Sequence, residues 1–252
     1  MCGVAGIVYR VPELYGNLGR DLLSLIQPLC SRGPDSCGVA LYGNYNEAGI
    51  VGQVEVYKEV GGVESLTRKY ELLGFSGTHG IGHTRMATES VVDTNHSHPF
   101  TASGDLSIVH NGQLSNYYRL RYQLERMGAV FVTNNDSEAI AHYIYYQLFQ
   151  GKSLEAALKQ LLNDVDGTYT FLVATPDKVA LVRDRFAAKP AVVYESSNTI
   201  AIASEYRALL NLNNFDPTAT IREPDAGEIN IWSVVQITNV ETRNFASLQD
   251  AL

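Results

Sequence analysis

The sequence predicts an α+β fold in a single domain, because its elements come in groups: short apolar strands, then helices, then strands again. It shows no regular alternation of strand and helix, the pattern of a doubly wound parallel sheet. The 252 residues, 45% of them hydrophobic, can bury a large core and approach the upper size of one domain. We therefore expect residues 1–252 to form one layered domain.

The first group contains four predicted strands and one helix. Gly3 to Tyr9 and Cys37 to Tyr42 are short apolar runs of the kind that form buried strands. Between them, Leu18 to Leu29 has the spacing of an amphipathic helix. Ile50 to Val56 and Ile81 to Thr84 complete the group as further strands.

The middle of the chain supplies a strand, Leu106 to His110, and then three helices. The predicted helices are Asn116 to Met127, Ser137 to Phe149 and Ser153 to Leu162. Gly128 caps the first, and Asn134-Asn135-Asp136 occupies cap positions before the second. The closing strands are Thr168 to Ala174, Val179 to Arg183, Ala191 to Tyr194, Thr199 to Ser204, Ile229 to Trp232 and Val234 to Thr238.

Charge and composition argue against several classes of function. A formal charge of −8 disfavours nucleic acid and acidic membranes as partners, because clustered lysine and arginine hold such ligands. No stretch is long and apolar enough to span a bilayer, and no secretion signal opens the chain, so we expect a cytoplasmic protein. No glycine-rich phosphate loop indicates a nucleotide site.

The sequence predicts neither a metal nor a cofactor in this chain. Its three cysteines are an odd number that matches no zinc spacing: Cys2, Cys30 and Cys37. His79 and His83 lie four steps apart in a predicted strand, about 13 Å, which is too far for one ion. His96 and His98 have no acidic or cysteine residue grouped with them.

Cys2 follows the initiator methionine, so removal of Met1 would place a thiol and a free α-amine on one residue. A thiol must lose its proton before it attacks a carbonyl, and a terminal amine titrates at about 7.7–8, well below a lysine at about 10.4. The residue would therefore carry its own base. The alternative is that Cys2 is a small apolar residue at the start of a buried strand.

Five separated motifs fit one chemistry, the attack of a thiol on the side-chain amide of a free amino acid. They are Met1-Cys2-Gly3-Val4-Ala5-Gly6-Ile7, Ser31-Arg32-Gly33-Pro34-Asp35-Ser36, Gly82-His83-Thr84-Arg85-Met86-Ala87-Thr88, Val109-His110-Asn111-Gly112 and Asn135-Asp136-Ser137-Glu138. In this order they resemble the class II glutamine amidotransferase domain of the N-terminal-nucleophile hydrolases. The resemblance implies a four-layer αββα sandwich and L-glutamine as the substrate.

The resemblance gives catalytic roles to Cys2, Asn111 and Gly112. Cys2 is the nucleophile, while the Asn111 side-chain amide and the Gly112 backbone N–H form an oxyanion hole. Loss of one such donor typically raises the barrier by about 2.7–4 kcal/mol. Taken alone, Asn111-Gly112 after an apolar run is ordinarily a turn.

The resemblance also assigns the binding of the amino-acid end of glutamine. Arg85 binds the α-carboxylate, a task that suits a planar guanidinium better than a lysine, and Thr88 supports it. Asp136 accepts the α-ammonium. Taken alone, Arg85 would be a surface ion pair and Asp136 a helix cap, and Asp136 can fill both roles at once.

The resemblance implies supporting roles for two further residues. Arg32, in a segment of rigid turn composition, would pack beside the nucleophile strand, and His98 would shape the pocket. The chain departs from the commoner family pattern at Met86, where an aromatic residue is usual, and at Arg185 and Ala187-Ala188, where proline and glycine are usual. These departures concern the subfamily and the lid over the pocket.

The implied reaction is hydrolysis of glutamine to glutamate and ammonia through a Cys2 thioester. Phe186-Ala187-Ala188-Lys189-Pro190 resembles the free-standing amidotransferase subunits of split glutamate synthases and N-methylglutamate synthase relatives. We therefore expect a separate synthase subunit that receives the ammonia and carries any flavin and iron–sulfur groups. The alternatives are a γ-glutamyl-peptide hydrolase of the same fold, and a noncatalytic regulatory or assembly subunit whose cysteine stays capped by Met1.

Overall fold

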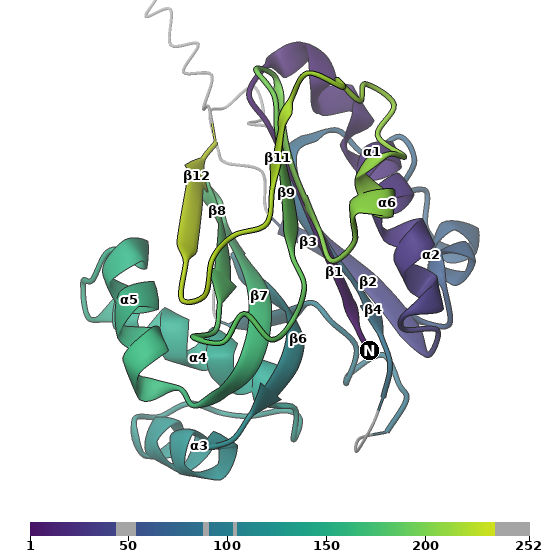
Figure 1. Ribbon diagram of the computed structural model, residues 1–252. Coiled ribbons are helices and arrows are strands. Elements are labelled where there is room, and N and C mark those ends of the chain that lie inside the picture. The colour runs from purple at the N-terminus through teal and green to yellow at the C-terminus, as the bar shows by residue number, and fades with distance from the viewer. Residues whose placement is uncertain (44–53, 88–90, 103–104, 235–252) are drawn as a thin grey trace, which may run out of the picture.

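The computed structural model describes residues 1–43, 54–87, 91–102 and 105–234, which form two stacked antiparallel sheets with helices on both outer faces (Figure 1). The layers run helix, sheet, sheet, helix. The prediction of an α+β, four-layer αββα sandwich is therefore confirmed. No helix in these ranges is long and apolar enough to cross a membrane.

Within the described residues, the first sheet has seven strands in the order β11-β9-β10-β1-β4-β2-β3. Their bounds are β1 Gly3–Tyr9, β2 Ser36–Gly43, β3 Val54–Val60, β4 Gly77–Arg85, β9 Val192–Glu195, β10 Thr199–Ala203 and β11 Thr220–Arg222. The central strand β1 pairs with β4 and β10, so Gly3 lies opposite Thr84. The start of β1 therefore lies beside the end of β4.

The second sheet, in the same described ranges, has five strands in the order β12-β8-β7-β6-β5. They are β5 Phe100–Ala102, β6 Leu106–Leu114, β7 Gly167–Thr175, β8 Lys178–Arg183 and β12 Ile229–Ser233. The helices α3 Tyr117–Arg126, α4 Asp136–Phe149 and α5 Leu154–Asp164 lie on its outer side. The outer side of the first sheet carries α1 Leu18–Ile26, α2 Val63–Lys69, α6 Tyr206–Leu209 and the 3₁₀ helices η1 Pro12–Asn17 and η2 Gln27–Ser31.

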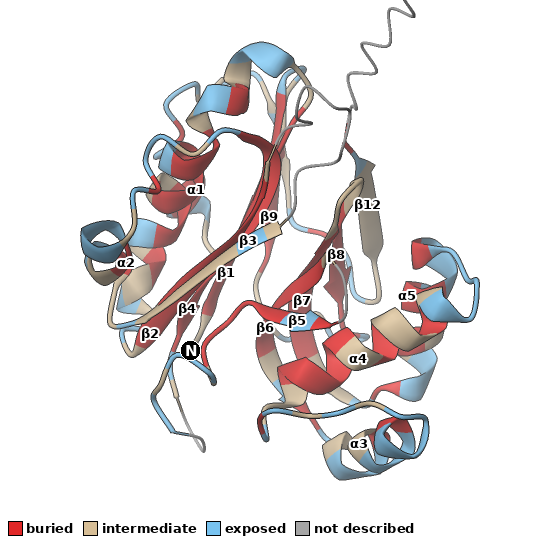
Figure 2. Ribbon diagram, turned by 180° about the vertical axis from the view of Figure 1, so that it is seen from behind, coloured by how far each residue is buried: buried red, intermediate tan, exposed pale blue. Residues whose placement is uncertain are grey.

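The sequence of β1 is a continuous apolar run because both faces of this strand are buried. Successive side chains of a strand point to opposite faces, so Val4 and Val8 enter the core between the sheets while Ile7 enters the core under α1. Every residue of β1 is buried, and in Figure 2 most strands are red, whereas β3 and β12 are largely tan. A strand that is buried on both faces has no polar alternation.

Several predicted boundaries are wrong; for example, β4 begins at Gly77 and not at Ile81. The strand β6 does not stop at His110 but continues to Leu114, because Gly112 takes a φ of +148° and keeps its pairing with Tyr169. The predicted helix Leu18 to Leu29 ends at Ile26 and continues as η2, since Pro28 has no N–H to extend the α-helical ladder.

Parts of two predicted strands lie outside the described residues. This holds for residues 50–53 of the expected strand before Val56 and for residues 235–238 of the expected last strand, whose first residue, Val234, is buried but not in a strand. The short helix α2 was not predicted.

Candidate active site

A cleft of about 890 Å³ is lined by groups from the start of β1, the end of β4, the strand β6 and the first turn of α4. It brings together the predicted site residues Cys2, Arg85, His98, Asn111, Gly112 and Asp136. Thr88 lies outside the described residues, and Arg32 lies behind the cleft, in contact with Cys2. Segments far apart in sequence therefore meet at one end of both sheets.

The Cys2 thiol lies against the chain just after β4. The backbone N–H of Met86 points at Sγ at 3.4 Å, and the carbonyl oxygen of Met86 lies 3.7 Å from it. Burial raises the pKa of the thiol above its ordinary value, while the Met86 N–H, the terminal amine and the guanidinium groups of Arg85 and Arg32 oppose the rise. The resting thiol is therefore protonated, and its use as a nucleophile needs a base.

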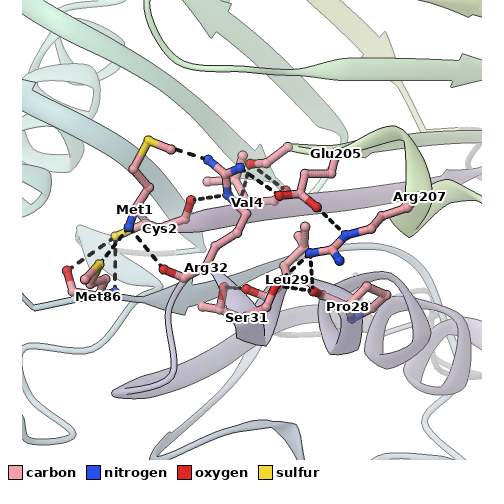
Figure 3. A network of polar contacts seen from close by, with 12 residues as sticks. Met1, Cys2, Val4, Pro28, Leu29, Ser31, Arg32, Met86, Glu205 and Arg207 are labelled. Atoms are coloured by element: carbon pink, nitrogen blue, oxygen red, sulfur yellow. Dashed lines mark hydrogen bonds and ion pairs between the residues drawn. The ribbon is translucent and has the colours of Figure 1, made fainter.

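Met1 and Cys2 are held by the turn that contains Arg32 (Figure 3). The Met1 amine donates to the Arg32 carbonyl at 3.1 Å and lies 2.7 Å from the Met86 sulfur. Arg32 Nε in turn donates to the Cys2 carbonyl at 3.0 Å. The predicted supporting position of Arg32 thus has a specific contact, which is with the backbone of the nucleophile residue.

Arg85 is the last residue of β4 and is only 3% exposed, so the surface position that we considered for it is wrong. One terminal nitrogen donates to the Val91 carbonyl at 3.0 Å. The chain around it is anchored by Asp35, whose N–H donates to the Arg85 carbonyl and whose carboxylate accepts from Ala87 N–H at 2.7 Å. A buried guanidinium that lines a cleft is suited to a carboxylate ligand.

Asn111 and Gly112 lie in β6 and not in a turn. Asn111 is 3% exposed, and its side-chain Nδ2 has no hydrogen-bond partner among the described residues. A Cβ added at Gly112 would lie 2.1 Å from the Thr168 carbonyl oxygen, so only glycine fits this backbone. A buried amide donor without a partner is costly unless a ligand accepts its hydrogen bond.

Asp136 begins α4, but the cap is Asn135, whose side chain accepts from Ser137 N–H at 2.9 Å. One carboxylate oxygen of Asp136 accepts from Leu114 N–H at 2.9 Å. Burial disfavours the charge on Asp136, yet His110 and hydrogen bonds from Leu114 and Ser137 outweigh burial and lower its pKa. Asp136 is therefore an anion at the cleft, and we assign it no capping role.

A cluster of three buried histidines lies behind this side of the cleft. The Ser137 hydroxyl contacts His98 Nε2 at 2.8 Å and His110 Nδ1 at 2.9 Å, and the rings of His83 and His98 are 3.8 Å apart. The predicted pocket-shaping role of His98 thus depends on Ser137. The contact of Ser137 with both histidines was not predicted, because it joins three segments that are distant in sequence. No group of three His, Cys, Asp or Glu in the described part of the chain could hold a metal ion.

The stacked antiparallel sheets between helix layers, with the nucleophile candidate at the start of a central strand, define the N-terminal-nucleophile hydrolase class. The chain belongs to the class II glutamine amidotransferase family: a family model of the glutamine amidotransferase domain matches residues 83–211. It is 34% identical to the glutamine amidotransferase-like protein GlxB of Rhizobium meliloti, over 92% of this chain and 98% of that protein.

Longer proteins share the same domain. The amidophosphoribosyltransferase of Methanocaldococcus jannaschii is 30% identical over 91% of this chain and 46% of its own length. In structure, the chain is similar to glutamine phosphoribosylpyrophosphate amidotransferase from B. subtilis, with a TM-score of 0.76 and 26% identity over 91% of this chain and 47% of that one. The chain thus spans about half the length of these two relatives.

Proposed function

We propose that this chain hydrolyses L-glutamine to glutamate and ammonia through a thioester on Cys2. The observation that carries the proposal is the shared cleft, which combines a thiol, a buried cation, a half-buried anion and a buried amide N–H group that has no partner among the described residues. These are the groups that a free amino acid with a side-chain amide requires.

Recognition of glutamine as a free amino acid follows from the two charged side chains. In the proposal, Arg85 pairs with the α-carboxylate, with Thr88 as a further contact, and Asp136 pairs with the α-ammonium. A glutamine inside a peptide has neither charge and would offer no opposite charge to Arg85 or Asp136. We therefore expect the site to discriminate strongly against it.

The chemical steps require Met1 to be removed. The free Cys2 amine then accepts the thiol proton, and the thiolate attacks the side-chain carbonyl carbon of glutamine. Asn111 Nδ2 and Gly112 N–H hold the oxyanion. The protonated amine gives its proton to the leaving nitrogen as the C–N bond breaks, which leaves a thioester and ammonia. Water, activated by the same amine, then releases glutamate.

The ammonia acceptor in this proposal is a separate synthase subunit of the glutamate synthase type, with any flavin and iron–sulfur groups on the partner. Two observations support a separate acceptor. The GlxB protein is matched over 98% of its own length, whereas the amidophosphoribosyltransferase has as much chain again beyond the matched part. The segment from Phe186 to Pro190 also resembles free-standing subunits.

The decisive experiment compares Cys2→Ala with Cys30→Ala, which removes a half-buried thiol that does not line the cleft. We expect Cys2→Ala to lower ammonia release from L-glutamine by at least about 10⁴-fold, because the covalent route is lost, while its melting temperature changes little. Cys30→Ala should retain activity. Undiminished ammonia release by Cys2→Ala would rule the mechanism out.

The same assay separates the two alternatives. Faster cleavage of a γ-glutamyl dipeptide than of glutamine would indicate a γ-glutamyl-peptide hydrolase. Intact mass reports Met1, and a chain that retains Met1 and releases no ammonia would indicate a noncatalytic subunit, because the amine that acts as the base is then blocked.

A further inference from the structure

A row of charged side chains crosses the end of the seven-stranded sheet behind Cys2 (Figure 3). Arg32 holds the Cys2 carbonyl through Nε, and another of its nitrogens donates to Glu205 Oε1 at 2.8 Å. The second carboxylate oxygen of Glu205 accepts from Arg207. The side chains of Arg32 and Glu205 are 11% and 24% exposed, so this pair is largely shielded from water and salt.

The backbone at Glu205 is fixed to the nucleophile strand. Ser204 follows β10 and binds Val4 twice: the Val4 N–H donates to the Ser204 hydroxyl at 2.9 Å, and the Ser204 N–H donates to the Val4 carbonyl at 2.9 Å. Because Val4 is two residues from Cys2, these bonds set the position of the Glu205 carboxylate relative to Cys2. The backbone that carries the Glu205 carboxylate is therefore held firmly against the nucleophile strand.

The outer guanidinium completes the arrangement. Arg207 donates to the Ser31 hydroxyl at 2.6 Å and to the Pro28 carbonyl at 3.2 Å, so the carboxylate is tied to η2 as well as to β10. Burial disfavours the charge on Glu205, but the hydrogen bonds from Arg32 and Arg207 outweigh it and lower its pKa. Glu205 is consequently an anion between two cations.

Arg32 holds the nucleophile residue through its side chain, which donates to the Cys2 carbonyl. While Met1 is present, the Arg32 carbonyl also accepts from the Met1 amine. Displacement of a reacting group by about 1 Å can lower a rate about 100-fold. We propose that Glu205 is a positioning residue for Cys2: it fixes the Arg32 guanidinium, which fixes the Cys2 carbonyl and thereby aims the thiol into the cleft. The expected effect on turnover rests on the proposed function.

The test uses Glu205→Gln, Glu205→Asp and the control Glu195→Gln. The control removes the carboxylate of another guanidinium pair, Arg10–Glu195, on the same sheet but outside the cleft. Three quantities are measured for each protein: melting temperature, kcat and KM for glutamine, and the pH dependence of Cys2 alkylation by iodoacetamide, located by peptide mass spectrometry.

We expect Glu205→Gln to lower kcat by about 10- to 100-fold with KM changed by less than about twofold, because Arg85 and Asp136 are untouched. Its alkylation curve should move to lower pH. The charges facing Sγ are those of Arg32, Arg85 and the terminal amine, and the neutral amide of the Glu205→Gln variant would no longer neutralise Arg32. Glu205→Asp keeps the carboxylate charge on a side chain that is one methylene shorter. Its alkylation curve should therefore match that of the wild type, while its kcat should lie between those of the wild type and Glu205→Gln.

The inference is overturned if both Glu205 variants match Glu195→Gln in kcat and alkylation and differ only in melting temperature, since that is the behaviour of a structural ion pair. Glu205→Asp keeps the test available if Glu205→Gln does not fold. If the wild type releases no ammonia, the proposed function fails, but alkylation still decides the role of Glu205: a shifted curve supports positioning and an unshifted curve refutes it.

Discussion

The two sides of the cleft hold their groups by different physical means. We call the side that carries Cys2 and Arg85 the nucleophile wall, and the side that carries Asn111, Gly112 and Asp136 the receptor wall. On the nucleophile wall, Arg32 and its ion pair fix the Cys2 backbone. The nucleophile wall is therefore held by hydrogen bonds and an ion pair.

Apart from the Asp136 carboxylate, the receptor wall depends on steric fit and on neutral groups. Its donor strand follows one backbone path that only Gly112 permits, and His83 and His98, packed behind it, are neutral. Burial lowers the pKa of His83 to about 3, and burial together with the neighbouring histidines lowers that of His98 well below its ordinary value. A wall of this kind cannot adapt, so we expect its steric changes to be the most damaging.

Gly112→Ala should therefore have the largest effect of any change on the receptor wall. The new Cβ would meet the Thr168 carbonyl oxygen at 2.1 Å, and the φ of +148° is one that alanine rarely adopts. We expect loss of stability above about 2 kcal/mol and loss of ammonia release by at least about 10³-fold, because the strand must move. Thermal unfolding and a glutaminase assay measure the two effects.

Gly128→Ala is the matched control, since Gly128 also has a positive φ, +97°, but nothing lies within 4 Å of its added Cβ. It should cost about 1 kcal/mol through backbone strain alone and leave turnover unchanged. If the two variants behaved alike, the close contact at Thr168 would not matter, and the distinction between the walls would fail.

Asn111→Ala tests the receptor wall without moving its backbone. The side-chain Nδ2 has no partner among the described residues, so its removal breaks no hydrogen bond at that atom in the resting protein. We expect kcat to fall about 10²- to 10³-fold with little change in KM, since an oxyanion donor acts in the transition state. Asn230→Ala, on β12 and outside the cleft, should leave kcat unchanged. A rise in KM at constant kcat would instead make Asn111 a ground-state binding group.

Local pattern was sufficient for most of the fold. Apolar runs located β1 and β2, and helical spacing with cap residues located α3 and α4, because these signals lie within a few residues of each element. The Asn111-Gly112 pair was interpreted as a turn because a dipeptide does not reveal its partner strand. Pairing with Thr170 and Tyr169 of β7 keeps the chain extended there.

The site residues that lie in sequence motifs could be predicted, and those outside motifs could not. Cys2, Arg85 and Asp136 lie in motifs that the sequence displays, and the fold brings them to one cleft. Glu205 also stands in a segment that resembles the family domain, Ala203-Ser204-Glu205. Its contact with Arg32 has no such signal, because 173 positions separate the two residues and the pairing of β10 with β1 brings them together. Contacts of this kind follow from sheet order, which strand propensities do not specify.

The smallest expected effect concerns His83, a neutral histidine of β4 that packs behind the receptor wall. His83 is buried with a pKa lowered to about 3, while in the unfolded chain a histidine titrates at about 6.5. Between these two pH values the unfolded chain binds a proton at His83 that the folded protein does not. The contribution of His83 to the free energy of unfolding is therefore complete above about pH 6.5 and is lost as the pH falls. His83→Gln removes the proton-binding difference and should lower stability at pH 8, since packing against His98 and the bond to the His110 carbonyl are disturbed.

The gap in unfolding free energy between the wild type and His83→Gln should therefore narrow as the pH falls, by about 1.4 kcal/mol at pH 5.5 relative to pH 8. Urea titrations of both proteins at each pH measure it, and the carboxylates shared by the two proteins cancel in the difference. A gap that stayed constant from pH 8 to 5.5 would mean that His83 takes up a proton in the folded protein as readily as in the unfolded chain. The histidine packing behind the receptor wall would then be charged in mildly acidic solution, and the contrast between neutral packing there and ion pairs behind the nucleophile wall would be lost.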